Sequence, residues 1–186
     1  MKESTDFILI KDNIFTEKEC EDMINTYQQN LQQGEKELFG YSFCDIEINT
    51  FKNNYKLQYV IDEYKKTFQD INKTASIWQL NNLRFKHFKP QHSFSSWHSE
   101  HCFSNPYRVL SLQIYLSNHN CGTEFSNYDK TIKSDIGKVV LFPAYFTHTH
   151  RGQICPENKD RYIITGYVNF IQKGKLEQWV VWENIN

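Results

Sequence analysis

The stretch FSSWHSEHCF, residues 94–103, places His98 and Glu100 two positions apart. On a β-strand such side chains point to the same side, so this imidazole and this carboxylate can converge on one ion. A transition metal needs a third ligand, and a second pair, His148 and His150, follows the apolar run GKVVLF. Two histidines and one carboxylate on one face of a metal, with the other positions open, suit Fe(II) and oxygen chemistry.

A candidate anion-binding residue, Arg161, opens the apolar run RYIITGYVNF. A permanently charged, planar guanidinium inside a barrel needs a carboxylate partner, which a dicarboxylate cosubstrate would supply. The alternatives are a surface arginine at a strand end and a histidine–glutamate pair that arose by chance. The order of the three features along a strand-rich chain favours a site.

The elements that must position these residues fall into two groups. Thr16 and Glu19 form a capping box for a helix that extends to about Gln29, and the apolar spacing of residues 55–69 indicates a second helix. After Trp78 the sequence changes to short runs of β-type residues separated by turn residues. These runs predict strands in LRFKHFK, RVLSLQIYLS, TEFSNY, TIKSDI, GKVVLFPA, RYIITGYVNF and QWVVW, and the run FILI before the first helix predicts another. Many short strands behind two helices predict an α+β fold, mainly β, in which the helices brace one face of a sandwich or barrel.

Composition limits the partners and the setting. The chain has 186 residues, a suitable length for one domain, 1–186, and no linker or repeat divides it. Its 21 basic and 22 acidic residues give a net charge of −1, which disfavours nucleic acid as a partner. Five scattered cysteines without a C-x-x-C pair argue against a disulfide framework and a structural zinc site. We therefore expect a reducing, cytoplasmic setting, with no secretion signal and no membrane span.

From Leu83 to Phe170, about half the chain, the sequence resembles the Fe(II)- and 2-oxoglutarate-dependent oxygenases, in particular the prolyl 4-hydroxylase-like branch. That family's pattern runs H-x-D/E, YLN, GGETxF, a strand that ends in FP, a distal histidine, and Arg or Lys on the last barrel strand. This chain has HSE, IYLSN, CGTEF, GKVVLFPAYFTHTHRG and RYIIT in that order. Glu100 stands where Asp is commoner, Cys121 replaces the first Gly of GGET, and Ser117 replaces the usual Asn.

The resemblance implies a double-stranded β-helix, a jelly-roll or cupin-like barrel, with its core motifs at about residues 83–170. His98 and Glu100 would be the proximal ligands of Fe(II). Arg161 would bind the C5 carboxylate of 2-oxoglutarate, with Thr165 and the Tyr115 hydroxyl beside it.

The resemblance leaves two candidates for the distal ligand. His150 precedes Arg161 by eleven residues and HRG matches the family's H-x-G, whereas His148 lies at the usual distance after Phe142 and Pro143. We favour His150 and keep His148 as the alternative. If the segment is a regular strand, both face the same way, and the second histidine would then orient a ligand or a water.

The implied activity is that of a dioxygenase that uses Fe(II), 2-oxoglutarate and O2 to hydroxylate a substrate C–H, with release of succinate and CO2. A prolyl residue of a peptide or protein is the first candidate substrate, and a free amino acid or another small molecule is the alternative. The principal rival is a non-catalytic, cupin-like barrel that binds a metal or a small acid, but such a barrel does not need Arg161. A nucleic-acid demethylase of the same superfamily lacks a basic stripe. A purely structural protein would leave the charges of Glu100 and Arg161 unexplained.

Overall fold

The described part of the protein consists of two antiparallel β-sheets and two long helices. The computed structural model describes residues 6–34, 36–38, 40–73, 77–171 and 181–183. Its helices are α1 (Glu17–Gly34) and α2 (Asn54–Thr67), with short 3-10 turns η1 (Ile48–Thr50), η2 (Gln69–Lys73) and η3 (Phe146–His148). Its strands are β1 (Leu9–Lys11), β2 (Lys36–Leu38), β3 (Tyr41–Ile46), β4 (Ile77–Phe88), β5 (Arg108–Tyr115), β6 (Gly122–Phe125), β7 (Lys130–Lys133), β8 (Val139–Pro143), β9 (His150–Gly152), β10 (Arg161–Ile171) and β11 (Val181–Glu183).

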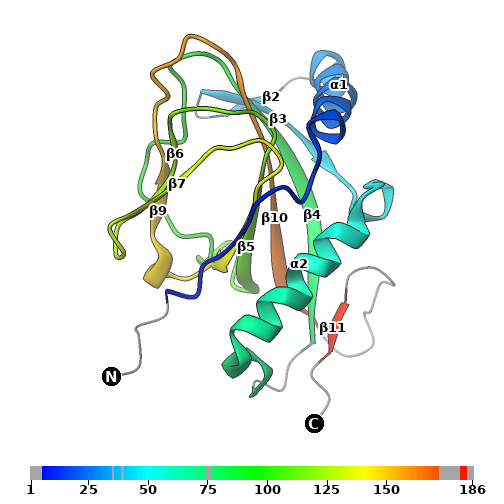
Figure 1. The fold of residues 1–186 in the computed structure, drawn as a ribbon, viewed down its shortest axis with the longest axis vertical. Coiled ribbons are helices and arrows are strands. Elements are labelled where there is room, and N and C mark those ends of the chain that lie inside the picture. The colour runs from blue at the N-terminus through cyan, green and yellow to red at the C-terminus, as the bar shows by residue number, and fades with distance from the viewer. Residues whose placement is uncertain (1–5, 35, 39, 74–76, 172–180, 184–186) are drawn as a thin grey trace.

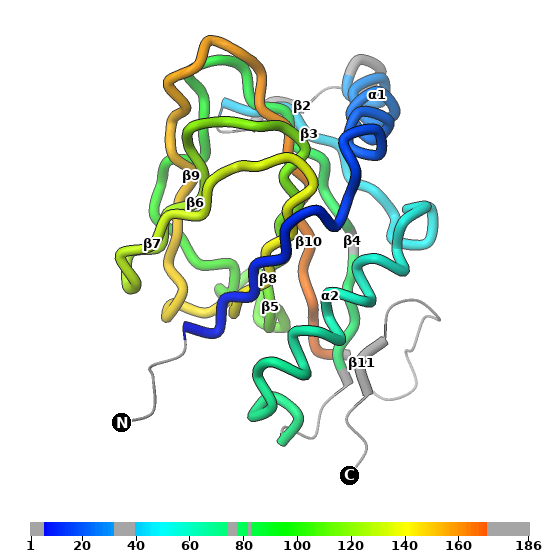
Figure 2. Tube along the Cα trace, viewed as in Figure 1, coloured from blue at the N-terminus to red at the C-terminus, as the bar shows by residue number. Residues whose placement is uncertain are grey.

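The larger sheet has eight strands in the order β1-β8-β5-β10-β4-β3-β2, and β11 pairs with β4 outside this path. The smaller sheet has the order β7-β6-β9. The smaller sheet lies opposite the larger one, and both helices lie on the other side of the larger sheet (Figure 1). The N-terminal segment runs beside β8, with Leu9 opposite Leu141 (Figure 2). This is the predicted mainly β, α+β arrangement, with helices that brace one face of a β-sandwich.

Both predicted helices are present, and their apolar faces are buried against the larger sheet. In the predicted capping box, the backbone N–H of Thr16 donates to the Glu19 carboxylate at 2.7 Å, and the backbone N–H of Glu19 donates to the Thr16 hydroxyl at 3.2 Å. Burial of the predicted apolar stripe anchors α2 through Leu57, Val60, Ile61 and Tyr64. These residues join one large hydrophobic core that contains the inner residues of β4, β5 and β8.

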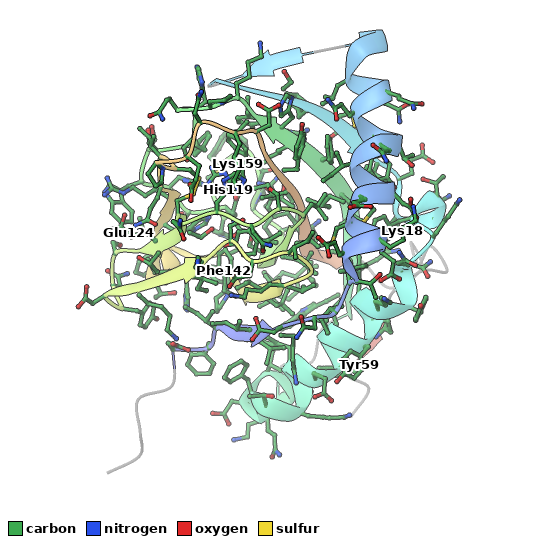
Figure 3. The ribbon with its side chains drawn as sticks, turned by 45° about the horizontal axis from the view of Figure 1, so that its top comes forward. Lys18, Tyr59, His119, Glu124, Phe142 and Lys159 are labelled. Atoms are coloured by element: carbon green, nitrogen blue, oxygen red, sulfur yellow. A yellow bond between two sulfur atoms is a disulfide. The ribbon has the colours of Figure 1, made fainter. Side chains whose placement is uncertain are left out.

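A second apolar cluster lies between the two sheets. Its largest members are aromatic, and they come from both sheets: Tyr41, Phe88, Tyr115, Phe125 and Phe142. Burial of aromatic side chains contributes strongly to folding free energy, and here it also forms the rigid walls of the space between the sheets. Figure 3 shows Phe142 between the two layers.

The structure contains strands that the sequence did not predict, and it describes only part of one that the sequence did predict. Strands β2 and β3 were not predicted, because YSFCDI alternates only weakly between apolar and polar residues. In the predicted strand QWVVW, residues 178–180 lie outside the described residues, and β11 begins at Val181. In the part of the chain that is described, no helix is both long and apolar enough to cross a membrane.

The sequence argued against a disulfide framework, but the structure contains one disulfide that was not predicted. Cys121 and Cys155 are joined by a disulfide, with their Cα atoms 5.0 Å apart. The two residues are 34 positions apart in sequence, in loops that the strand pairing brings together, and a search for closely spaced cysteines does not find such a pair. Cys20, Cys44 and Cys102 are free.

Candidate functional site

The candidate metal centre is assembled where residues 98–100 meet β9 between the two sheets. His98 and His150 form an isolated antiparallel bridge, in which each backbone N–H donates to the other residue's carbonyl, at 3.0 and 2.9 Å. The backbone N–H of Glu100 donates to the carbonyl of Ala144 just after β8. Backbone hydrogen bonds therefore hold all three residues, although the HSE segment is not the regular strand that its spacing predicted.

The side chains of His98, Glu100 and His150 converge. One ligand atom from each residue lies within 4.8 Å of the other two. His98 Nε2 is 3.5 Å from Glu100 Oε1, and His150 Nε2 is 3.9 Å from the same oxygen. Two imidazole nitrogens and one carboxylate oxygen thus face a common point, as a facial two-histidine, one-carboxylate metal site requires.

The histidine tautomers suit metal binding. His98 Nδ1 contacts the carbonyl of Ser96 and His150 Nδ1 contacts the carbonyl of His148, both at 2.9 Å. A carbonyl only accepts hydrogen bonds, so Nδ1 carries the proton in both rings and each Nε2 presents a lone pair. Hydrogen bonding of the second ring nitrogen in this way is the usual support of a metal-bound histidine.

Electrostatics keep these groups in the protonation states that a metal needs. Burial alone would raise the pKa of Glu100, but the hydrogen bond to His98 and the nearby charge of Lys86 outweigh it and lower the pKa to about 2. Burial lowers the pKa of His150 to about 4, with a further contribution from His98. At neutral pH the site therefore offers an ionised carboxylate and a neutral imidazole at His150.

Arg108 holds the carboxylate of Glu100 from the other side. Its Nη1 donates to Glu100 Oε2 at 2.9 Å, and its guanidinium lies over the ring of Tyr167, 3.5 Å from the centroid. This contact leaves Oε1 free to face the two histidines. Sequence reasoning missed Arg108 because the only signal was an ordinary arginine at the start of a strand.

His148, the alternative distal residue, lies outside the cluster. It ends the 3-10 turn η3, so it and His150 do not share the face of one regular strand. Its Nε2 contacts the carbonyl of Asp6 at 2.6 Å, and its Nδ1 contacts the Thr147 hydroxyl. The turn between the two histidines explains why the sequence alone could not separate them.

Arg161 is buried at 5% exposure, and no carboxylate in the described residues pairs with it. Its Nη2 donates to the Ser93 hydroxyl at 3.0 Å, and its Nη1 donates to the Gln153 carbonyl and to the Cys121 sulfur. Within the described chain its Nε has no hydrogen-bond partner. Burial lowers the pKa of the guanidinium, but Arg remains charged in proteins, so this residue needs an anion.

A cavity of about 660 Å³ joins Arg161 to the three converging side chains. Tyr115 and Thr165, the other two predicted residues, line it. The Tyr115 hydroxyl donates to Thr123 Oγ1 at 2.7 Å, and burial raises its pKa to about 12, so it stays a neutral phenol. The Thr165 hydroxyl is buried without a hydrogen-bond partner in the described part of the chain. All six residues predicted for the site therefore border one cavity.

The cavity also contains basic residues that sequence reasoning did not identify. Arg84, Lys86 and Arg108 line it together with Arg161, whereas Glu100 is the one acidic residue in its lining. Burial lowers the pKa of Lys86 to about 8, partly offset by Glu100. The described lining is thus net positive, which favours anionic ligands.

No protein-family model matches the sequence, and no curated protein matches it. The structure, in contrast, is similar to several solved structures. A viral collagen prolyl hydroxylase from Paramecium bursaria Chlorella virus-1, in a complex with 2OG, has a TM-score of 0.68 and 15% identity, over 89% of this chain and 97% of that one. A prolyl-4-hydroxylase from Pseudomonas putida has a TM-score of 0.69 and 10% identity, over 90% of this chain and 95% of that one.

A third similar structure is a prolyl hydroxylase from Trichoplax adhaerens, in a complex with a peptide fragment of the hypoxia inducible factor oxygen degradation domain. Its TM-score is 0.67, its identity is 15%, and the match covers 89% of this chain and 84% of that one. At identities this low, the likeness establishes the fold: the chain has the fold of the prolyl hydroxylases.

Proposed function

We propose that this protein is an Fe(II)- and 2-oxoglutarate-dependent dioxygenase built on a double-stranded β-helix. The observation that carries the proposal is the convergence of His98 Nε2, His150 Nε2 and Glu100 Oε1 in a cavity that also contains a buried arginine, for which the described residues offer no carboxylate partner. A barrel that only binds a metal would need the three converging ligands and not the buried arginine. The two together fit a metal and a dicarboxylate bound side by side.

In this proposal His98, Glu100 and His150 hold Fe(II), which leaves the other coordination positions open. Arg161 binds the C5 carboxylate of 2-oxoglutarate, and Tyr115 and Thr165 supply hydroxyl groups beside it. When bound, Fe(II) and 2-oxoglutarate supply the oxidising chemistry, in which O2 hydroxylates a substrate C–H and 2-oxoglutarate becomes succinate and CO2.

The chain's own residues position and protect this chemistry. The backbone carbonyls of Ser96 and His148 fix the tautomers of the two histidines, and Arg108 fixes the carboxylate. Tyr115 stays protonated, so it adds no negative charge beside an anion at Arg161. The aromatic cluster between the sheets excludes water from the inner end of the cavity, which strengthens the ion pair there.

For the substrate, we propose a prolyl residue of a peptide or protein, with a free amino acid or another small molecule as the alternative. Cys102, Ser104 and Asn105 line the cavity, and the neighbouring Phe103 and Tyr107 are exposed. Exposed aromatic side chains beside an active-site opening suit the binding of a peptide. The peptide complex of the Trichoplax prolyl hydroxylase supports the same choice.

The decisive experiment is the release of succinate from 2-oxoglutarate. The protein is loaded with Fe(II) without oxygen and exposed to air, with and without a pool of proline-containing peptides. We expect iron-dependent succinate and peptide products heavier by one oxygen atom. The variants His98→Ala, Glu100→Ala and Arg161→Ala, checked for folding by circular dichroism, should each lose this turnover.

The outcomes separate the rival functions. Protein that binds neither Fe(II) nor 2-oxoglutarate would overturn the proposal in favour of a non-catalytic, cupin-like barrel. Succinate release without modification of any peptide would retain the dioxygenase and contradict the prolyl substrate, and a screen of free amino acids would follow.

A further inference from the structure

A second cluster of metal-binding residues lies in the loops that precede β6 and β10. One ligand atom each from His119, Cys155 and Glu157 lies within 4.8 Å of the other two. The sulfur of Cys121 is bonded to that of Cys155, so it lies at the same place. The four residues form two pairs with the spacing of His98 and Glu100: His-x-Cys at 119–121 and Cys-x-Glu at 155–157. Figure 3 shows His119 near Lys159, on the loop that precedes β10.

Two buried acceptor atoms in this cluster face each other without a donor. The side chain of His119 is 0% exposed, and its Nδ1 lies 3.8 Å from Glu157 Oε2, which is too long for a hydrogen bond. Both atoms are buried without a hydrogen-bond partner in the described residues. Buried acceptors without partners are costly, and a cation between them would satisfy both.

The other atom of each side chain is already engaged, which fixes the direction of the free one. His119 Nε2 contacts the Asp160 carbonyl and the Ser117 hydroxyl, both at 3.1 Å. The carbonyl only accepts hydrogen bonds, so Nε2 carries the proton and Nδ1 presents a lone pair. Glu157 Oε1 accepts a hydrogen bond from the backbone N–H of Asn120 at 2.8 Å, which turns Oε2 towards His119. In metal sites the second polar atom of each ligating side chain is typically hydrogen-bonded in this way.

We propose that, when the Cys121–Cys155 bond is reduced, His119, Cys121, Cys155 and Glu157 form a second metal site for a borderline-soft divalent cation such as Zn²⁺. Two thiolates, one imidazole and one carboxylate are ligand types that Zn²⁺ accepts in a four-coordinate site. The inference goes beyond the proposed dioxygenase and does not depend on it, because the two sites share no metal ligand; Arg161 contacts the Cys121 sulfur but is a ligand in neither site.

The change from the disulfide to the metal-bound form has two steps, reduction of the disulfide and binding of Zn²⁺. A dithiol reductant transfers two electrons to the disulfide, which becomes two thiols, and the reductant becomes a disulfide. Zn²⁺ then binds the two sulfurs as thiolates and releases both protons. The disulfide and the metal therefore exclude each other.

The charges around the cluster tolerate this ligand set. Two thiolates and one carboxylate carry three negative charges, so the site with Zn²⁺ keeps one. Arg161 donates to the Cys121 sulfur at 3.3 Å, and the charge of Lys159 also reaches His119. A thiolate accepts a hydrogen bond from a guanidinium more strongly than a disulfide sulfur does, so these cations stabilise the metal-bound form.

The test uses Co²⁺ as the probe, because a thiolate bound to Co²⁺ gives an intense near-ultraviolet charge-transfer band. The iron site has no sulfur ligand and cannot give this band. The full-length chain is stripped of metal, reduced with a phosphine and titrated with Co²⁺ without oxygen. We expect two Co²⁺ per chain and the charge-transfer band, which added Zn²⁺ removes. The same preparation oxidised with diamide should bind one Co²⁺ and lack the band.

Matched variants assign the band to the cluster. The double variant Cys121→Ser, Cys155→Ser should abolish the band because it removes both thiolates, whereas Cys102→Ser, at an exposed free cysteine, should leave it unchanged. His119→Gln and Glu157→Gln should weaken Co²⁺ binding at this site by at least about tenfold. His98→Ala should lose one Co²⁺ and keep the band, which separates this site from the iron site.

Two results would overturn the proposal. One is reduced wild-type protein that binds Co²⁺ without a charge-transfer band. The other is a band that survives in the double variant Cys121→Ser, Cys155→Ser but disappears in Cys102→Ser. The comparison of reduced and oxidised wild-type protein needs no variant, so misfolding of a variant cannot hide the answer.

Discussion

At the residue scale, the THTH segment contains two histidines with different surroundings. His150 faces His98 and Glu100, whereas His148 contacts the carbonyl of Asp6. We expect His150→Gln to lower Fe(II) affinity by at least about 100-fold and His148→Gln to change it only a few-fold. Anaerobic Fe(II) titration of both variants measures this. Tight binding by His150→Gln together with loss in His148→Gln would contradict the assignment.

Arg161 gives a second test at this scale. Removal of one partner from a buried ion pair costs about 2–5 kcal/mol, so Arg161→Met should raise the dissociation constant of 2-oxoglutarate by at least about 30-fold. Arg161→Lys should raise it less, because lysine keeps the charge and loses the planar fork. Calorimetry with the Mn²⁺-loaded protein measures both values. Unchanged affinity in Arg161→Met would show that the cosubstrate carboxylate binds elsewhere.

The pKa of His150 makes metal-free protein sensitive to acid. Its pKa is lowered from 6.5 to about 4 in the folded state, so the unfolded state binds the proton first as the pH falls. This group therefore does not reduce the free energy of unfolding above pH 6.5. As the pH falls towards 4, it lowers that free energy by about 3 kcal/mol. Urea unfolding of the metal-free protein at several pH values measures the loss. If the free energy of unfolding of His150→Gln depended on pH as strongly as that of the wild type, His150 would not be the cause of the acid sensitivity.

At the element scale, the capping box of α1 is the feature that the sequence predicts most directly. Thr16→Ala should lower the free energy of unfolding by about 1 kcal/mol, because the Glu19 N–H loses its hydroxyl acceptor. Thr26→Ala, at an exposed position in the same helix, is the matched control and should change stability by less than about 0.5 kcal/mol. Chemical denaturation of both variants decides, and equal effects would mean that the cap contributes nothing.

The same scale shows what the sequence could and could not predict. Both helices and the strands β4, β5, β8 and β10 follow from apolar periodicity, because their buried faces are long. The six candidate site residues were named from the sequence and line one cavity, and their roles stay a prediction. The sequence did not indicate that one isolated bridge holds the HSE segment or that His148 ends the turn η3. Such local geometry depends on tertiary hydrogen bonds that leave no periodic signal. The contact between Arg108 and Glu100 is missed for the same reason.

At the scale of the whole molecule, the Cys121–Cys155 disulfide closes a loop between residues that are 34 positions apart. The entropy lost by the unfolded chain predicts about 4 kcal/mol of stabilisation. Urea unfolding of the oxidised and the reduced protein, both in a metal chelator, should differ by about this amount. Equal stabilities would show that the crosslink does not constrain the unfolded state.

The order of strands in the larger sheet has a consequence for biosynthesis. Strand β10 lies between β4 and β5 and is made long after both. The edges of β4 and β5 that pair with β10 therefore have no partner until the ribosome has passed residue 171. During that interval the unpaired backbone N–H and C=O groups along these edges are exposed to other nascent chains. The protein is therefore expected to depend on chaperones during translation, and a ribosome stall before Arg161 would produce an aggregation-prone fragment with neither Arg161 nor a closed sheet.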